Sequence, residues 1–234
     1  MPETLSTIVP EIVPEAVLFD LDGTLVDTAP DLAHATNALR QHHGLEPLPF
    51  EQIRGQVSNG GSALVTLAIG LEHGTQAHDT ARQYLLDTYE QAVAVHSQVF
   101  SPLDHWLARW HSDARLWGIV TNKPRRYTLP LLKALALNPG ALLCADDLSV
   151  KKPAPEPLWE AAHRLGVPPQ ACWYVGDHVR DMEAAKAAGM TAVAVGYGYI
   201  SEEDNYQQWP ADIWFETCED LVDALNAFHR SVER

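Results

Sequence analysis

Five short apolar runs recur along the chain, and most of them end in polar residues. The later runs are separated by segments with helical spacing, each closed by a glycine that favours a helix end: residues 157–165 before Gly166, and residues 179–188 before Gly189. Strands that alternate with helices predict a doubly wound parallel sheet of the Rossmann-like α/β class. The predicted strands are Ala16–Phe19, Leu116–Val120, Ala141–Cys144, Cys172–Val175 and Thr191–Val195.

Composition limits the partners of such a chain. Its 234 residues, 46% of them hydrophobic, are enough for one substantial core and a smaller accessory unit. A formal net charge of −15 argues against binding to nucleic acid or to an anionic membrane surface. No apolar stretch approaches the ~20 residues of a membrane helix. We therefore expect a cytoplasmic protein with no nucleic-acid or membrane partner.

The cysteines and the two ends of the chain add smaller constraints. Three widely spaced cysteines, in or near apolar segments, favour buried free thiols over a disulfide framework or a zinc site. Residues 1–15 hold three prolines and no long apolar core, which predicts a flexible lead-in rather than a secretory signal. Residues 213–234 predict a strand fragment followed by a final helix.

Two carboxylates, Asp20 and Asp22, follow the first apolar run directly. Residues two apart on an extended segment face the same side, so both side chains can point at one ligand or metal ion while Leu21 faces away. Gly23 allows the chain to turn sharply behind them. An acidic turn after a strand is the simpler interpretation. The two carboxylates nevertheless predict an anion- or metal-handling site at this strand end.

The next strand ends carry further polar residues. Thr121-Asn122 follows the second run, Lys152 lies in a proline-stiffened loop after the third, and Asp177 and Asp181 follow the fourth. Each has a simpler explanation. Thr121-Asn122 can form a turn or helix cap, and Lys152 can belong to a solvated basic pair. Asp177 can be an N-cap, and Asp181 can complement a helix dipole. Because ligands of open α/β sheets bind outside the carboxyl ends of the strands, we expect these side chains to form one site with the first pair.

The order of these motifs resembles that of the haloacid dehalogenase superfamily of aspartate-nucleophile phosphatases. The shared features are D-x-D-G-T at residues 20–24, a strand-terminal Thr121, Lys152-Pro153 after a strand, and G-D-x-x-x-D at residues 176–181. The resemblance extends over the chain from Ala16 onward. It implies that Asp20 is the nucleophile and forms an aspartyl-phosphate, and that Asp22 is the general acid and base.

The resemblance also implies how a phosphoryl group would be held. Thr121, Lys152 and backbone amides near Leu21 and Asn122 would contact its oxygens. Mg²⁺ would be bound by the carboxylates of Asp20 and Asp177, by the backbone carbonyl of Asp22 and, in support, by Asp181, an oxygen-only set that suits this ion. The metal and Lys152 would neutralise carboxylates that otherwise repel a phosphate dianion.

Three alternatives to phosphatase activity remain within the same resemblance. A dehalogenase is disfavoured because members of that branch lack the second Asp, here Asp22. A phosphosugar mutase shares all four motifs and stays open. A catalytically silent binding protein would be expected to have lost Asp20, Asp22 or Asp177, and all three are present.

The long segment between the first two strands indicates an inserted folded unit. About eighty residues lie there, too many for a connecting loop. Apolar residues at helical spacing, with expected stops at Gly44 and Gly74, predict a small all-helical cap over residues 30–97. The α/β core would then comprise residues 16–29 and 98–234. Within the cap, Ser58, Asn59 and Gly60 are the predicted substrate contacts, although a helix cap explains the same residues.

The cap type and the Ser-Asn-Gly-Gly loop resemble the phosphoglycolate phosphatase group most closely. The segment 196–200, with residues 203–205 and Trp209, also resembles a bacterial branch assigned to N-acetylmuramic acid 6-phosphate. Both resemblances imply a small phosphomonoester as substrate, and the choice between them stays open here. The choice between monomer and homodimer also stays open.

His178 and Lys151 are less usual at their positions in the motifs. His42-His43 is expected at a helix end, and Trp106 and Trp110 in the core.

Overall fold

The computed structural model describes residues 13–112, 115–201 and 204–232. Most of the expected lead-in, residues 1–12, therefore lies outside the described residues, as does Glu203. No helix in the described ranges is both long and apolar enough to cross a bilayer.

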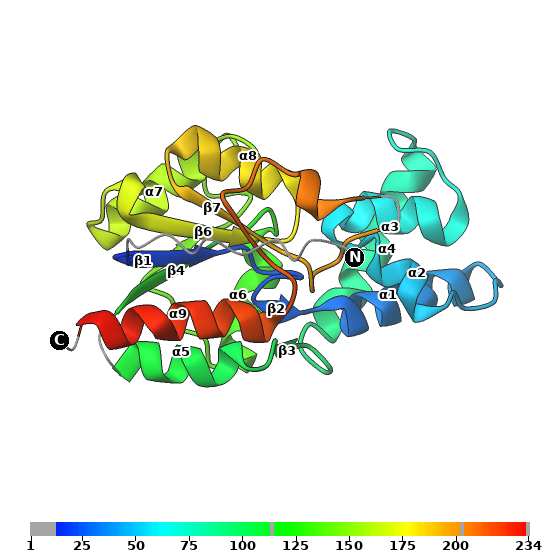
Figure 1. The fold of residues 1–234 in the computed structure, drawn as a ribbon. Coiled ribbons are helices and arrows are strands. Elements are labelled where there is room, and N and C mark those ends of the chain that lie inside the picture. Colours follow the sequence, from blue (N-terminus) through cyan, green and yellow to red (C-terminus); the bar gives the residue numbers. More distant parts are fainter. Residues whose placement is uncertain (1–12, 113–114, 202–203, 233–234) are drawn as a thin grey trace, which may run out of the picture.

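Six parallel strands form the central sheet, in the order β5-β4-β1-β6-β7-β8 (Figure 1). All five predicted strands are confirmed, each within one residue of its expected end. The final strand fragment is confirmed as β8. The strands are β1 Ala16–Phe19, β4 Leu116–Val120, β5 Ala141–Leu143, β6 Cys172–Gly176, β7 Thr191–Val195 and β8 Ile213–Phe215. The central strand β1 pairs with β4 on one side and β6 on the other, so the loops that follow these three strands meet at one edge.

Helices cover both faces of the sheet, as a doubly wound fold requires (Figure 1). Side chains alternate along β1: Val17 and Phe19 face one helical layer, and Ala16 and Leu18 the other. The first layer contains α5 Leu103–Ser112, α6 Arg125–Ala134 and α9 Cys218–Val232, and the second contains α7 Glu156–Leu165 and α8 Val179–Ala188.

The aromatic residues of α5 fill the first layer. Trp106 is 2% exposed and meets Phe19 edge-on, with 6.0 Å between ring centroids. Trp110 is buried beside it, which confirms that these tryptophans belong to the core. The three cysteines are also buried, and burial raises the pKa of each thiol to about 11. They are therefore poor nucleophiles at neutral pH.

Four α-helices lie between two short antiparallel strands, β2 Val26–Asp27 and β3 Gln98–Val99. These helices, together with Tyr127 and Tyr199, form a hydrophobic cluster of their own. Buried Asp31 anchors the segment that returns to β3, because its carboxylate accepts hydrogen bonds from the amides of His96 and Ser97. The helices are α1 Ala29–His42, α2 Phe50–Arg54, α3 Gly60–Ile69 and α4 Gln76–Gln91, with a 3₁₀ turn at Val57–Asn59.

One expected helix stop is misplaced. The first helix ends at His42 with His43 as its C-cap, just before Gly44 as predicted. The third helix ends earlier than Gly74, because Gly70 adopts the left-handed conformation (φ 70°) that closes α3. Gly74 instead lies in the turn before α4. The boundaries of a separate cap at residues 30 and 97 stay a prediction.

Two leucines on α6 allow a matched test of the core. Leu131 is fully buried against the sheet, whereas Leu129 on the same helix is 47% exposed. We expect Leu131→Ala to lower the free energy of unfolding by about 2–5 kcal/mol, because it removes buried methyl groups and leaves a cavity. Leu129→Ala should change it by less than about 1 kcal/mol. Urea denaturation of both variants measures the difference; equal losses would contradict the assigned packing of α6.

Candidate active site

A cavity of about 320 Å³ lies between the carboxyl end of the sheet and the inserted helices. Its floor comes from the loops after β1, β4, β5 and β6, and its roof from α1, the 3₁₀ turn, α3 and α4. The sheet side contributes Asp20, Asp22, Thr121, Asn122, Lys123, Lys151, Lys152, His178 and Arg180. The strand-end residues expected to meet thus line a single cavity or adjoin it.

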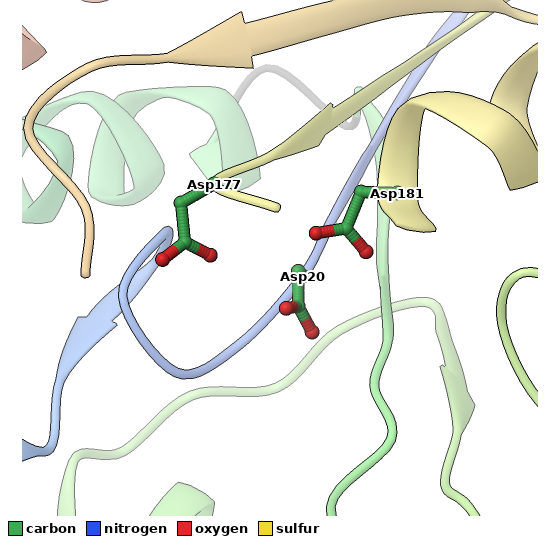
Figure 2. Close-up of side chains that lie close together, drawn as sticks. All are labelled: Asp20, Asp177 and Asp181. Atoms are coloured by element: carbon green, nitrogen blue, oxygen red, sulfur yellow. The ribbon is translucent and has the colours of Figure 1, made fainter. Parts of the chain in front are cut away.

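Three carboxylates gather below this cavity (Figure 2). Asp20 follows β1, Asp177 follows β6, and Asp181 lies in the first turn of α8. One oxygen from each lies within 4.8 Å of the others. The N-cap of α8 is His178, whose side chain accepts a hydrogen bond from the Arg180 amide, so the cap interpretation of Asp177 is wrong.

Lys152 is the buried cation of this cluster. Its ammonium lies 2.9 Å from Asp20 Oδ1 and 2.7 Å from Asp181 Oδ1, and it donates a 2.6 Å hydrogen bond to the Tyr174 hydroxyl. The interpretation of residues 151–152 as a solvated pair is wrong for Lys152, which is 2% exposed, while Lys151 is exposed. One buried ammonium therefore faces three carboxylates.

Burial raises the pKa values of two of these carboxylates. Desolvation raises the pKa of Asp20 from 3.8 to about 6, even though Lys152 opposes the shift. Burial, with the nearby Asp20 and Asp181, raises the pKa of Asp177 to about 7. Asp181 Oδ2 is buried without a hydrogen-bond partner among the described residues. Hard oxygen ligands that are short of positive charge fit a divalent cation.

Asp177 is oriented from three sides. Thr24 Oγ1 donates to its Oδ1 at 2.9 Å, and the Tyr199 amide donates to its Oδ2 at 2.9 Å. Ser58 Oγ, from the inserted helices, donates to the same Oδ2 at 3.1 Å. A Cβ at Gly198 would lie 2.2 Å from Asp177 Cβ, so the glycine permits this close approach. Rotation of this carboxylate is thus strongly restricted.

Asp22 is held by a different cation. Lys123 Nζ lies 2.8 Å from its Oδ1, and Thr28 Oγ1 donates to the same oxygen at 2.5 Å. Burial lowers the pKa of Lys123, but Asp22 and Tyr89 outweigh it and raise the pKa overall. Sequence reasoning missed Lys123, although it follows Thr121-Asn122 directly in the same strand-end loop. Asp20 and Asp22 thus have separate lysine partners.

Thr121 and Asn122 both lie at the site. Thr121 is buried and its hydroxyl accepts a hydrogen bond from the Lys123 amide, while the Asn122 side chain donates to the Lys152 carbonyl at 2.9 Å. Neither residue caps α6, whose N-cap is Pro124. Leu21 is fully buried in the core, so its side chain faces away as predicted.

The three predicted residues of the inserted loop line the cavity, with different contacts. Ser58 contacts Asp177 and, through its carbonyl, accepts a 2.8 Å hydrogen bond from Arg180. Asn59 occupies the N-cap position of α3 without a side-chain capping bond and donates instead to the side chain of Gln56. Gly60 adopts a left-handed φ of 81°. The loop thus touches the elements that carry Asp177 and Asp181.

Sequence reasoning also missed the contribution of α4. Arg82, Leu86 and Tyr89 line the cavity from this helix. Their spacing of four and three residues places them on one helix face, which is a readable signal. This spacing alone does not indicate a function, because the sequence does not show what the helix face lies against.

The model of the family "haloacid dehalogenase-like hydrolase" matches residues 17–195. The chain belongs to this family. The N-acetylmuramic acid 6-phosphate phosphatase of Pseudomonas aeruginosa is 40% identical over 214 residues, which cover 91% of this chain and 95% of that protein. The phosphoglycolate phosphatase of Xylella fastidiosa is 40% identical over 206 residues, or 87% and 89% of the two chains.

A solved structure agrees with this assignment. The predicted phosphoglycolate phosphatase from Haemophilus somnus has a TM-score of 0.78 at 25% identity, covering 89% of this chain and 96% of its own. The resemblance to the haloacid dehalogenase superfamily and the predicted fold are thereby confirmed. The curated relatives are named phosphatases, in keeping with a hydrolytic family.

Removal of Lys152 should destabilise the protein in a pH-dependent manner. The pKa of Asp20 in the folded protein is higher than that of an exposed carboxyl. Ionisation of Asp20 therefore lowers the free energy of unfolding as the pH rises above the pKa of an exposed carboxyl. Without Lys152 this penalty increases. At pH 8 in EDTA we expect Lys152→Met to lower the free energy of unfolding by about 3–5 kcal/mol.

At pH 5.5 the loss should be smaller, because Asp20 and Asp177 are then mostly protonated. Lys151→Met, at the exposed neighbouring position, is the matched control and should be close to neutral at both pH values. Denaturant titration of the three proteins measures the effect; a loss independent of pH would argue against the charge imbalance.

Proposed function

We propose that the protein is a magnesium-dependent phosphomonoester hydrolase that acts through an aspartyl-phosphate on Asp20. The observation that carries the proposal is the position of Asp20: it lines the cavity, its carboxylate lies 2.9 Å from the Lys152 ammonium, and one of its oxygens lies within 4.8 Å of oxygens of Asp177 and Asp181. A carboxylate so placed can attack phosphorus in line while its neighbours hold the phosphoryl oxygens.

The other residues have complementary roles in this proposal. Asp22 donates a proton to the leaving oxygen and later removes one from the attacking water. Its side chain lines the same cavity as that of Asp20 but pairs with a different lysine, which supports separate roles for the two carboxylates. Lys152, Thr121 and backbone amides near Leu21 and Asn122 stabilise the charge on the phosphoryl oxygens.

The proposed cofactor is Mg²⁺. The carboxylates of Asp20 and Asp177 and the backbone carbonyl of Asp22 would hold it, with Asp181 in support; the buried, unpartnered Asp181 Oδ2 and the raised pKa of Asp177 are consistent with such a site. When bound, the ion would neutralise carboxylates that repel the substrate and would polarise a phosphoryl oxygen.

Helices α1–α4 are proposed to act as a cap of residues 30–97 on a core of residues 16–29 and 98–234. Ser58, Asn59 and Gly60 line the cavity from the cap side and would contact the substrate. Closure of this cap would exclude water from the aspartyl-phosphate.

The substrate is proposed to be a small phosphorylated metabolite in the cytoplasm, handled by a monomer or homodimer. Phosphoglycolate is one candidate, since several relatives are named phosphoglycolate phosphatases. N-acetylmuramic acid 6-phosphate is the second, since two relatives with similar identity are named for it.

Phosphate release from 2-phosphoglycolate, N-acetylmuramic acid 6-phosphate and hexose phosphates tests the activity. We expect release in the presence of Mg²⁺ from at least one compound and none in EDTA. Asp20→Asn should lower kcat by at least about 10⁴-fold, because the amide cannot act as the nucleophile. Thermal denaturation should show that the variant is folded.

Two other outcomes bear on the alternatives. Isomerisation of a sugar phosphate without net phosphate release would favour a mutase. A folded, Mg²⁺-binding protein that processes none of the compounds would favour a silent binder and would contradict the proposed hydrolase.

A further inference from the structure

The cavity is rich in positive charge although the chain is strongly acidic. Two carboxylates line it, those of Asp20 and Asp22, and each is paired with a lysine. Arg82, Lys151 and Arg180 also line it. Among the described residues, none of these three forms an ion pair with a carboxylate. In a protein of net charge −15, unneutralised cations around one cavity indicate an anionic ligand.

Of these cations, Arg82 lies on the helix side of the cavity, whereas Arg180 lies beside the catalytic residues. Arg180 donates to the carbonyl of Ser58 and lies against His178, on the element that carries Asp181. Arg82 instead projects from α4 in the roof, beside α3: a Cβ at Gly61 would lie 3.8 Å from its Nε. Arg82 is exposed and lines the cavity, so its guanidinium can receive a ligand without breaking an ion pair.

The spacing of residues along α4 gives the distance between Arg82 and the catalytic end of the cavity. Tyr89 marks the catalytic end, because the Lys123 ammonium lies 4.6 Å from its ring centroid and 2.8 Å from Asp22. Arg82 precedes Tyr89 by seven residues, which corresponds to roughly 10 Å along a helix axis. All side chains of a helix lean toward its N-terminus, so Arg82 and Tyr89 lean in the same direction and this spacing applies to the points where both side chains leave the helix.

Apolar side chains also line the cavity. Leu86 lies between Arg82 and Tyr89 on α4, and Leu32, Val57 and Leu64 line the same cavity. The cavity thus combines a phosphoryl-binding end, apolar side chains and an arginine about two helical turns from Tyr89. The carboxylate of 2-phosphoglycolate is separated from the phosphate ester oxygen by a single carbon, which is too short to reach from one end to the other.

We propose that Arg82 is a specificity-determining residue that binds a carboxylate on the far side of the substrate from its phosphoryl group. This inference rests on the proposed phosphatase function. The substrate class it names is a phosphorylated sugar acid, in which a ring separates phosphate and carboxylate and packs against the leucine-rich wall. N-acetylmuramic acid 6-phosphate has this arrangement: its phosphate is on carbon 6, and its lactyl carboxylate is attached through the oxygen on carbon 3 of the ring. The planar guanidinium suits bidentate binding of such a carboxylate.

A matched pair of substrates tests the proposal. N-acetylglucosamine 6-phosphate is N-acetylmuramic acid 6-phosphate without the lactyl group. We expect the wild type to favour the muramic compound in kcat/KM by on the order of 10- to 100-fold, as for a charge-assisted hydrogen bond. Arg82→Met keeps the side-chain stem but removes the charge, and it should reduce this ratio to within a few fold of one. Arg82→Lys should keep part of the wild-type ratio, since lysine keeps the positive charge but cannot bind a carboxylate through two parallel hydrogen bonds.

Controls separate this inference from general damage to the enzyme. Arg164→Met removes an exposed arginine of α7 that pairs with Glu160, and it should leave the ratio at the wild-type value. An unchanged ratio in Arg82→Met, or a wild-type preference for 2-phosphoglycolate over the muramic compound, would overturn the role of Arg82 while leaving the phosphatase intact. Hydrolysis of hexose phosphates but of none of these three compounds would likewise overturn the role of Arg82 and leave the phosphatase intact. Failure to hydrolyse any of these compounds or the hexose phosphates would remove the proposed function, and this inference with it.

Discussion

The contact of Lys152 with Asp20 and Asp181 is the interaction on which the site depends. Three carboxylates lie within a few ångströms at the end of the sheet, and the buried ammonium contacts two of them directly. The pKa values of Asp20 and Asp177 are raised, chiefly by burial and also by the neighbouring carboxylates, and three carboxylates face one buried lysine. The remaining negative charge is consistent with the proposed Mg²⁺ site, through which the protein would bind the phosphoryl group of a substrate.

The topology of the sheet brings these groups together. Strands β1, β4 and β6 are neighbours and parallel, so their carboxyl ends meet at one edge. Short loops then hold each functional side chain in place: the Asn122 side chain binds the Lys152 carbonyl, and Tyr199 binds Asp177 through its amide. The two carboxylates of the first motif acquire different surroundings because Lys152 approaches one and Lys123 the other.

Sequence patterns predicted the parts of this structure that follow from local rules. Apolar runs gave the strands, and Gly166 and Gly189 marked helix ends because each adopts the left-handed conformation there. The motif residues follow strand ends, whose meeting place is set by topology. Contacts made by the inserted helices could not be predicted in this way. That Ser58 contacts Asp177, and that Arg82 and Leu86 line the same cavity as Asp20, depends on how α3 and α4 lie over the sheet.

The central claim is that Asp20 carries the phosphoryl group, and the most direct measurement is to find it there. Wild type and Asp22→Asn are mixed with a hydrolysed substrate and Mg²⁺, quenched in acid within one turnover, and digested for mass spectrometry. We expect one phosphoryl group on the peptide that contains Asp20, and a slower rise and a slower decay of this species in Asp22→Asn, because Asp22 is proposed to act in both steps. Steady hydrolysis with no phosphoryl group on Asp20 in either protein, or with the group on another residue, would contradict the account.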